Sequence, residues 1–401
     1  MPPTIDNQGP VPCRRVFLPD ILASFSCDMC GECCSVWEIP VDRESYDRVV
    51  AALGEAAAER LVVVNPLSRR DYARLKLLDG RCGFQQGSLC SIHRNHGEGL
   101  LFPECRKFPR VLFSTPLAIH ATASFACSKM LASLDRPERV RTLHVTARDV
   151  PFAPELCDTA VEGPPCLRRG TALTWEAFFA IEHAFLEMLA QAGRPIEVRL
   201  LTMVEFVRSL GRDDEVPVQK ATVDRELQTA RIDGFHELGD RFLFLSDGVE
   251  PQLCFVLELL RLRIEAGLAR SWERLPLTAA YSRWASLPEG RRLARFVEDH
   301  RRCGGSFEGR TGRILENYLV CRLAGNPEFV LADMETGLGT VVALYALARA
   351  VAVAAAAGGE LTPRTMLESI RAVDTAFFHL PDFGELVRGR RVEAAALLAP
   401  C

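Results

Sequence analysis

Eight of the fifteen cysteines in the 401-residue chain fall within a single stretch of about one quarter of its length. Four of them lie within eight consecutive positions. The full set is Cys27, Cys30, Cys33, Cys34, Cys82, Cys90, Cys105 and Cys127. The segment around them is rich in turns and poor in apolar residues, so a metal is needed to stabilise it. We therefore predict that these eight cysteines are metal ligands.

The spacing of the cysteines favours an iron–sulfur cluster over a zinc ion. Structural zinc sites usually pair two Cys-x2-Cys motifs, whereas Cys82 and Cys90 are separated by seven residues. A cluster tolerates irregular spacing because it spans the thiolates that bind it. We expect a [4Fe–4S] cluster, with zinc as the alternative, and leave the number of centres open. His93 is either a further ligand or a histidine bonded to backbone in a tight loop.

Positive charge surrounds one of the candidate ligands. Arg106, Lys107 and Arg110 lie next to Cys105 in the sequence. Four thiolates around a [4Fe–4S]²⁺ cluster leave a net negative charge, which nearby cations stabilise in a poorly solvated site. The alternative is that they are surface cations beside a buried free cysteine.

The overall composition is that of an ordinary globular protein. The formal net charge is −4, so no bulk charge draws the chain to nucleic acid or to an anionic membrane. The first ten residues have neither a basic start nor an apolar run, so we expect a cytoplasmic protein with reduced thiols. Residues 337–357 imitate a membrane span, but alanine dominates and Arg349 lies within them. We predict a buried helix there, and no membrane span.

The hydrophobic pattern predicts an α+β protein that is mostly α. Residues 1–20 form an N-terminal extension, 21–150 a small loop-rich cysteine-cluster domain, 151–170 a proline-rich linker and 171–401 an α-helical domain. In the first domain, Asp42 is a plausible helix N-cap, and two short strands are expected within 79–90. In the second, Thr174 caps a helix. Further helices are expected at 197–210, 251–267, 288–302, 311–324, 335–357 and 363–378.

The order of the cysteine motifs resembles a known family. The motifs are Cys27-x2-Cys30-Gly31-x-Cys33-Cys34, Cys82-x7-Cys90-x-Ile92-His93, Pro103-x-Cys105-Arg106-x-Phe108-Pro109 and then Cys127. They resemble the cysteine-cluster superfamily of zinc- or iron-chelating domains. The added helical region, the length and the segment Leu315-Glu316-Asn317-Tyr318-Leu319-Val320 also look like the flagellin lysine-N-methylases, a branch of that superfamily.

This resemblance implies an enzyme and a substrate. It implies an iron–sulfur protein that transfers methyl groups from S-adenosylmethionine to surface lysines of a protein such as flagellin. The rival interpretation is a metal-binding redox or interaction protein without methyl transfer. The chain has no glycine-rich loop between a strand and a helix, and Gly337-Leu-Gly-Thr340 reads as a closely packed helix start. The S-adenosylmethionine site is therefore left unassigned.

A few residues of the helical region could handle a lysine substrate. Glu316 falls within an apolar arc of its helix, so it needs either a structural arginine or an incoming lysine as partner. Asn317 and Tyr318 could orient an amine. Trp175, Phe178 and Phe179 are either an aromatic wall for a cation or plain core, and the spacing favours core. His379 is interpreted as structural, at a helix end that would favour its cation.

Overall fold

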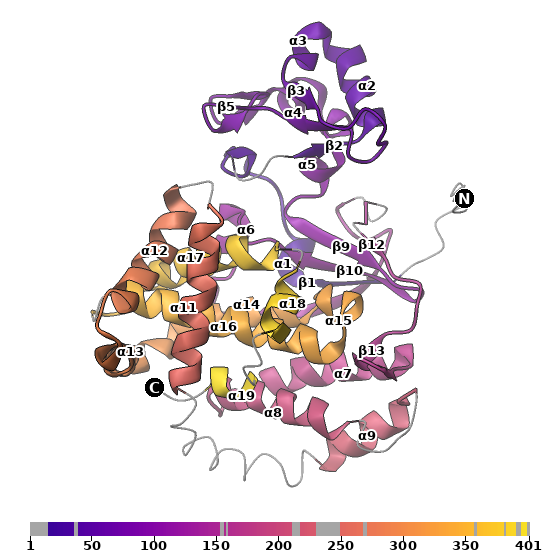
Figure 1. Cartoon of the computed structure of the whole chain (residues 1–401). Helices are drawn as coiled ribbons and strands as arrows, with labels where there is room; N and C mark the ends of the chain where they lie inside the picture. The colour runs from indigo at the N-terminus through magenta and orange to yellow at the C-terminus, as the bar shows by residue number, and fades with distance from the viewer. Residues whose placement is uncertain are drawn as a thin grey trace.

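The structure is a computed structural model that describes residues 15–35, 39–152, 156–157, 159–210, 217–229, 249–267, 271–356, 359–380, 382–389 and 394–398. Figure 1 shows a small cysteine-bearing unit set above a larger body of helices and one sheet. Helix predominates and the strands are short, so the predicted mostly-α α+β class is confirmed.

The small unit folds around a three-stranded sheet of order β2-β4-β3 and short helices. Its elements are β2 (Pro40–Val41), α2 (Arg43–Leu53), α3 (Glu55–Ala58), β3 (Leu61–Val63), β4 (Ala73–Leu75), α4 (Ser91–His96), η2 (Glu98–Leu100) and α5 (Pro103–Lys107). Asp42 caps α2 as predicted, because its carboxylate accepts a hydrogen bond of 2.8 Å from the backbone N–H of Ser45. Val49, Tyr72, Phe84 and Phe102 are among the residues of a core that belongs to this unit alone.

Two miniature hairpins deliver two of the predicted ligands. The strands are β5 (Leu77–Leu78), β6 (Arg81–Cys82), β7 (Gln85–Gln86) and β8 (Leu89–Cys90). β5 pairs with β6 and β7 pairs with β8, both antiparallel. Three of these strands, β6, β7 and β8, lie within 79–90, where two were expected, and β7 and β8 form the predicted glycine-bearing hairpin. Cys82 and Cys90 each end the second strand of a hairpin, which fixes both thiols on a rigid turn.

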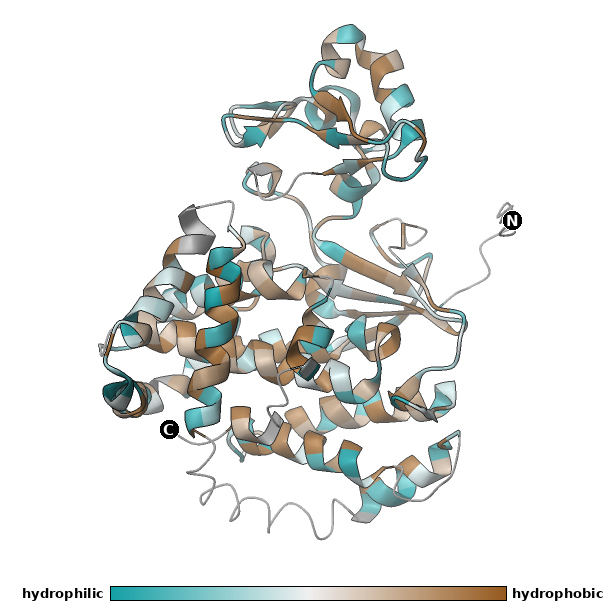
Figure 2. Ribbon diagram, in the orientation of Figure 1, coloured by the Kyte–Doolittle hydropathy of each residue, from teal (hydrophilic) through white to brown (hydrophobic). Residues whose placement is uncertain are grey.

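A five-stranded sheet joins the cysteine region to the helices. Its order is β11-β1-β10-β9-β12. The strands are β1 (Arg15–Pro19), β9 (Arg110–Ser114), β10 (Ala118–Ala123), β11 (Thr142–Thr146) and β12 (Thr159–Ala160). β10 is parallel to β1 and antiparallel to β9, and all six of its residues are buried. Figure 2 shows apolar colouring along much of this sheet. The central strand therefore has protein on both faces.

The helices of the body match most of the predicted ranges within two residues. They are α1 (Asp20–Ala23), α6 (Ser128–Ala132), α7 (Trp175–Leu189), α8 (Ile196–Ser209), α9 (Lys220–Thr229), α11 (Val249–Glu265), α12 (Ser271–Ala285), α13 (Glu289–Cys303), η5 (Gly304–Phe307), α14 (Gly309–Leu323), α15 (Glu328–Leu331), α16 (Met334–Ala356), α17 (Pro363–Val373), the π-helical turn η6 (Asp374–Phe378), α18 (Phe383–Gly389) and α19 (Ala394–Leu397). Thr174 caps α7 because its side-chain oxygen accepts a 3.2 Å hydrogen bond from Ala177 N–H.

A further hairpin pairs β13 (Cys166–Arg168) with β14 (Thr171–Ala172). Helices α9 and α12 were not expected from the sequence.

Helix α16 lies in the middle of the body. It is long and apolar enough to cross a membrane, yet 89% of its most apolar window is buried inside the protein. Arg349 near its centre pairs with Glu197 at 2.6 Å, and its guanidinium lies 5.1 Å from the ring centre of Phe307. The charge that argued against a membrane span is thus neutralised by a neighbouring helix. The predicted buried helix is confirmed.

The two hydrophobic cores do not follow the predicted domain ranges, 21–150 for the cysteine-cluster domain and 171–401 for the helical domain. One core contains residues between Val41 and Phe102. The other contains Val16, Leu112 and Val140 together with the helices. The five-stranded sheet, whose residues fall largely within the range expected for the cysteine-cluster domain, therefore packs with the body. Leu167 of β13 belongs to that core, and Phe152, Leu156 and Cys157 pack against it, so parts of residues 151–170 also join the body.

Gly337 provides a test of packing around α16. An added Cβ there would lie 2.9 Å from the backbone nitrogen of Phe329 and closer still to its ring, whereas at Gly339 the nearest atom is 3.7 Å away. We expect Gly337→Ala to lower the free energy of unfolding by about 1–3 kcal/mol through overpacking. Gly339→Ala, the control, should be neutral or raise it by up to about 1 kcal/mol. Thermal or denaturant unfolding measures both, and equal effects would contradict this packing.

Candidate metal centre

The loop that carries four of the cysteines lies between α1 and β2 and is held by Gly31. Gly31 has φ +75°, and an added Cβ would collide with the backbone oxygen of Ser88 at the tip of the β7–β8 hairpin. Only glycine permits both the left-handed backbone and this close approach. Cys33 and Cys34 follow in a 3₁₀ turn, η1 (Cys33–Ser35). The loop therefore packs directly against the hairpin that ends in Cys90.

Six of the eight predicted ligands line one cavity of about 660 Å³. They are Cys27, Cys33, Cys34, Cys82, Cys90 and Cys105. Cys127 is buried at the start of α6 and Cys30 is exposed on the loop. The cavity lies at the junction of the small unit and the body, because its lining also includes Val111, Ser124 and His379. Residues distant in sequence are thus brought to one site.

Cys33 is the electrostatic centre of this group. Its charge contributes to raising the pKa values of Cys27, Cys82, Cys105 and Cys127. Burial is the largest cause at each of the four and raises the pKa of Cys82 to about 11 and that of Cys127 to about 11. The pKa of Cys33 itself is raised, first by a hydrogen bond with Cys34 and then by burial. The thiols therefore repel one another when ionised.

This donor set fits a thiophilic metal. A cation among the thiols removes the mutual repulsion and favours the thiolate, which is the ligating form. Two groups share Cys33: one with Cys82 and Cys105, which also interact with Cys90, and one with Cys27 and Cys127. In the described part of the chain, no three Cys, His, Asp or Glu side chains already stand in ligating geometry. The side chains must therefore close around the metal.

The three cations near Cys105 have different positions. Arg106 is directed toward Glu98, with 3.5 Å between Nε and Oε1, and is not part of the cavity lining. Lys107 and Arg110 do line the cavity and are buried. Lys107 pairs with Glu104 at 2.8 Å. Two of the three expected cations thus face the thiols.

Two histidines reach the cavity. His93 is half-buried in its lining, on helix α4 just after Cys90. His379 lies on the opposite, body side, where its Nε2 is 2.8 Å from the hydroxyl oxygen of Ser124. Burial, followed by the charge of Arg322, lowers the pKa of His379 to about 3. The expectation that a helix end favours its cation was wrong, because desolvation outweighs the helix dipole. Ser124 was not singled out in the sequence.

Ion pairs fasten the cysteine loop to the body. Asp28 pairs with Lys129 of α6 at 3.0 Å, and Glu32 pairs with Arg371 of α17 at 3.0 Å. Glu32 also accepts a hydrogen bond from the hydroxyl of Ser128. The residues between the candidate ligands therefore connect the loop to two helices.

Glu316 lies away from the cavity in a cluster of arginines. Its carboxylate pairs with Arg199 at 2.7 Å, Arg313 at 2.8 Å and Arg139 at 3.3 Å. Its neighbour Asn317 is buried and accepts a hydrogen bond of 2.8 Å from Val140 N–H. This geometry favours the structural ion pair over the catalytic role that the sequence also allowed.

The other aromatic candidates are also part of the core. Phe178 and Phe179 pack edge to face at 5.5 Å, and Trp175 contacts both. Phe179 also stacks on the buried ring of His120. Tyr318 is buried and donates its hydroxyl to Asp374 at 3.3 Å. The plain-core interpretation of the aromatic group is therefore favoured.

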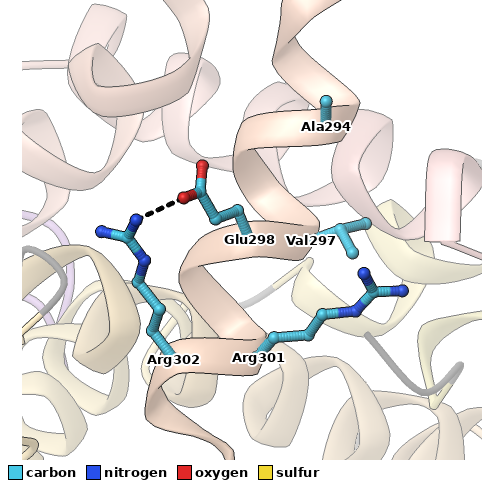
Figure 3. Close-up of a pocket in the computed structure, with 5 residues that line it drawn as sticks. All are labelled: Ala294, Val297, Glu298, Arg301 and Arg302. Atoms are coloured by element: carbon cyan, nitrogen blue, oxygen red, sulfur yellow. Dashed lines mark hydrogen bonds and ion pairs between the residues drawn. The ribbon is translucent and has the colours of Figure 1, made fainter.

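A second hollow, of about 480 Å³, is lined by one helix alone (Figure 3). Its lining residues are Ala294, Val297, Glu298, Arg301 and Arg302 of α13. Glu298 and Arg302 form an exposed i,i+4 ion pair across one helical turn. With no thiol in its lining, this hollow has no part in the metal centre.

Comparison with known families agrees with the thiol geometry. Residues 26–128 match the family model CxxCxxCC, described as "Putative zinc- or iron-chelating domain". This match supports a metal-binding cysteine-cluster domain in this segment. No curated protein and no solved structure matches the chain. The resemblance to the flagellin lysine-N-methylases therefore stays a prediction.

The ligand assignment can be tested by removing thiols one at a time. We expect Cys27→Ala, Cys30→Ala and Cys33→Ala each to lower bound metal, with the largest loss at Cys33 because it interacts with both groups. Cys254→Ala, at an exposed cysteine of α11, is the control and should retain full metal. Metal analysis of the purified proteins gives the result. Full metal content in all three loop variants would contradict the assignment.

The role of Glu316 is tested by a change that keeps its shape. Glu316→Gln leaves three arginines short of one carboxylate, so we expect the free energy of unfolding to fall by about 3 kcal/mol. Glu368→Gln breaks an exposed pair with Arg364 and should cost about 0.5 kcal/mol or less. Denaturant unfolding measures both. Unchanged stability in Glu316→Gln would restore the catalytic interpretation.

Proposed function

We propose that the cysteine-lined cavity holds an iron–sulfur cluster and that the protein is a lysine N-methyltransferase acting on another protein. The observation that carries the first part is the convergence of six thiols on one cavity. Cys33, Cys82, Cys90 and Cys105 would hold the principal centre. Cys27, Cys30, Cys34 and Cys127 are the remaining candidate ligands.

The size of the cavity supports a role beyond structural stabilisation. About 660 Å³ lies within the range of roughly 300–1,000 Å³ that is usual for ligand pockets. A structural zinc site needs no such space, because four protein ligands enclose the ion. The lining also includes apolar residues such as Phe84, Phe102 and Phe108. Such a surface suits an aliphatic stem like that of lysine.

Methyl transfer is the activity that the resemblance implies. S-adenosylmethionine would supply the methyl group together with the reactive sulfonium. The lysine Nζ gains the methyl and loses one proton, and S-adenosylhomocysteine leaves with a neutral sulfur. Since a free lysine has a pKa near 10.4, the site must favour the neutral amine. Desolvation in an apolar cavity lowers the pKa of an amine and thus supports this role. Flagellin is the proposed class of substrate.

One preparation tests both parts of this proposal. Protein purified without oxygen should be brown and contain iron with acid-labile sulfide. Incubated with flagellin and S-adenosylmethionine, it should add 14 Da increments to lysines, detected by mass spectrometry, as follows from replacing one hydrogen by a methyl group. Cys33→Ala should lose both properties, and Cys254→Ala should keep both.

Two outcomes would change the proposal. Colourless protein with stoichiometric zinc and no sulfide would replace the cluster with a zinc centre. Iron–sulfur protein that adds no mass and binds no S-adenosylmethionine by calorimetry would favour the rival function, a redox or interaction protein without methyl transfer.

A further inference from the structure

Arg110 is a buried arginine in the wall of the cysteine cavity. It is the first residue of β9, and its side chain is part of the cavity lining. Only 8% of its surface is exposed. Its guanidinium carbon lies 4.8 Å from the ring centre of Phe152 and 5.3 Å from that of Phe25. Aromatic rings therefore hold the guanidinium in place without neutralising its charge.

Arg110 differs from three other buried arginines in that no described carboxylate forms an ion pair with it, although the charge of Glu98 acts on it from further away. Arg199 pairs with Glu316 at 2.7 Å, Arg322 with Asp374 at 3.4 Å and Arg349 with Glu197 at 2.6 Å. Among the residues that the structure describes, no carboxylate forms an ion pair with Arg110, and its buried Nε has no hydrogen-bond partner. Burial lowers the pKa of Arg110, whereas the charges of Glu98 and Cys27, neither of which forms an ion pair with it, raise it. A buried charge without a partner is costly, so an anion that enters the cavity would gain a strong interaction there.

The surroundings of Arg110 describe the rest of such a ligand. Ser124 and His379 lie on the same body side of the cavity and are joined by their 2.8 Å hydrogen bond. Much of the remaining lining is apolar, with Ile92, Leu101, Phe102, Phe108 and Val111. The cavity thus brings a cationic group, an apolar surface and a group of thiols into one space.

We propose that Arg110 binds the carboxylate of a small ligand whose apolar body extends through the cavity toward the cysteines. The proposal rests on the metal-loaded cavity of the proposed function and names the class of molecule that enters it. A guanidinium binds carboxylate and phosphate alike in a planar, two-bonded geometry. The single charge of a carboxylate matches one arginine. A phosphate would bring a second negative charge toward the thiolates, with which it has unfavourable electrostatics.

Calorimetry with matched probes tests this assignment on the metal-loaded full-length protein. Hexanoate is the carboxylate, hexanamide its neutral counterpart of similar shape, and hexyl phosphate the competing oxyanion. We expect hexanoate to bind at least about tenfold more tightly than hexanamide, as is typical of a charge-assisted hydrogen bond. Hexyl phosphate should bind more weakly than hexanoate.

Substitutions assign the effect to the guanidinium. Arg110→Gln should weaken hexanoate about tenfold and leave hexanamide unchanged, while Arg110→Lys should restore part of the difference. Arg94→Gln is the control, since Arg94 is exposed, bonds to Gln86 and does not line the cavity. It should bind all three probes like the unchanged protein.

Several results would overturn the assignment. Equal affinity of the unchanged protein for hexanoate and hexanamide would overturn it without any variant, even if Arg110→Gln failed to fold. Preference for hexyl phosphate would overturn the carboxylate class. If Arg110→Gln loses metal during purification, metal is added back before calorimetry. If reloaded Arg110→Gln and Arg110→Lys then still prefer hexanoate to hexanamide as the unchanged protein does, Arg110 is a counter-charge for the metal centre only. Metal analysis of the same samples separates these outcomes from failure of the proposed function: zinc in place of iron, with hexanoate still preferred, would refute the cluster and leave the carboxylate site standing.

Discussion

Repulsion among buried thiolates is the constraint that governs the cysteine region. Five of the thiols have pKa values that burial or a neighbouring thiol raises, and the charge of Cys33 acts on four of them. Without a cation the group stays protonated, and the small unit then depends on a core of modest size. A bound metal converts this mutual repulsion into shared coordination. The hairpins, the glycine turn and the helix α5 all serve to hold thiols where that exchange can take place.

The cavity combines contributions from the two hydrophobic cores. The small unit supplies the hairpin cysteines and apolar residues such as Phe84, whereas the body supplies Arg110 from β9, Ser124 just after β10 and His379 just after η6. A metal site needed only for stability would be enclosed by the small unit. Here residues of the body also line the cavity, which brings polar groups into the same space as the candidate metal ligands. The helical body is thus part of the site, since it forms one of its walls.

Sequence reasoning was strongest where a pattern is local. Caps at Asp42 and Thr174, the period of α7 and α16, and the set of clustered cysteines depend on neighbours within a few residues, and the structure has these helices as expected. The sheet was missed because β1 pairs with strands about a hundred residues further along the chain, which no local period reveals. Glu316 was recognised as needing a partner, but the choice between a substrate and three arginines required tertiary contacts. Ser124 carried no signal at all, because its hydrogen bond to His379 spans 255 positions.

The two ion pairs of the cysteine loop have a thermodynamic consequence. Asp28 and Glu32 alternate with Cys27, Cys30 and Cys33, so one short segment carries candidate metal ligands and also contacts helices α6 and α17. If docking of the loop strengthens metal binding by some free energy, then bound metal must strengthen docking of the loop by the same free energy. Metal affinity and docking of the loop are therefore linked, so a metal that binds this segment would raise the fraction of molecules in which the loop is docked.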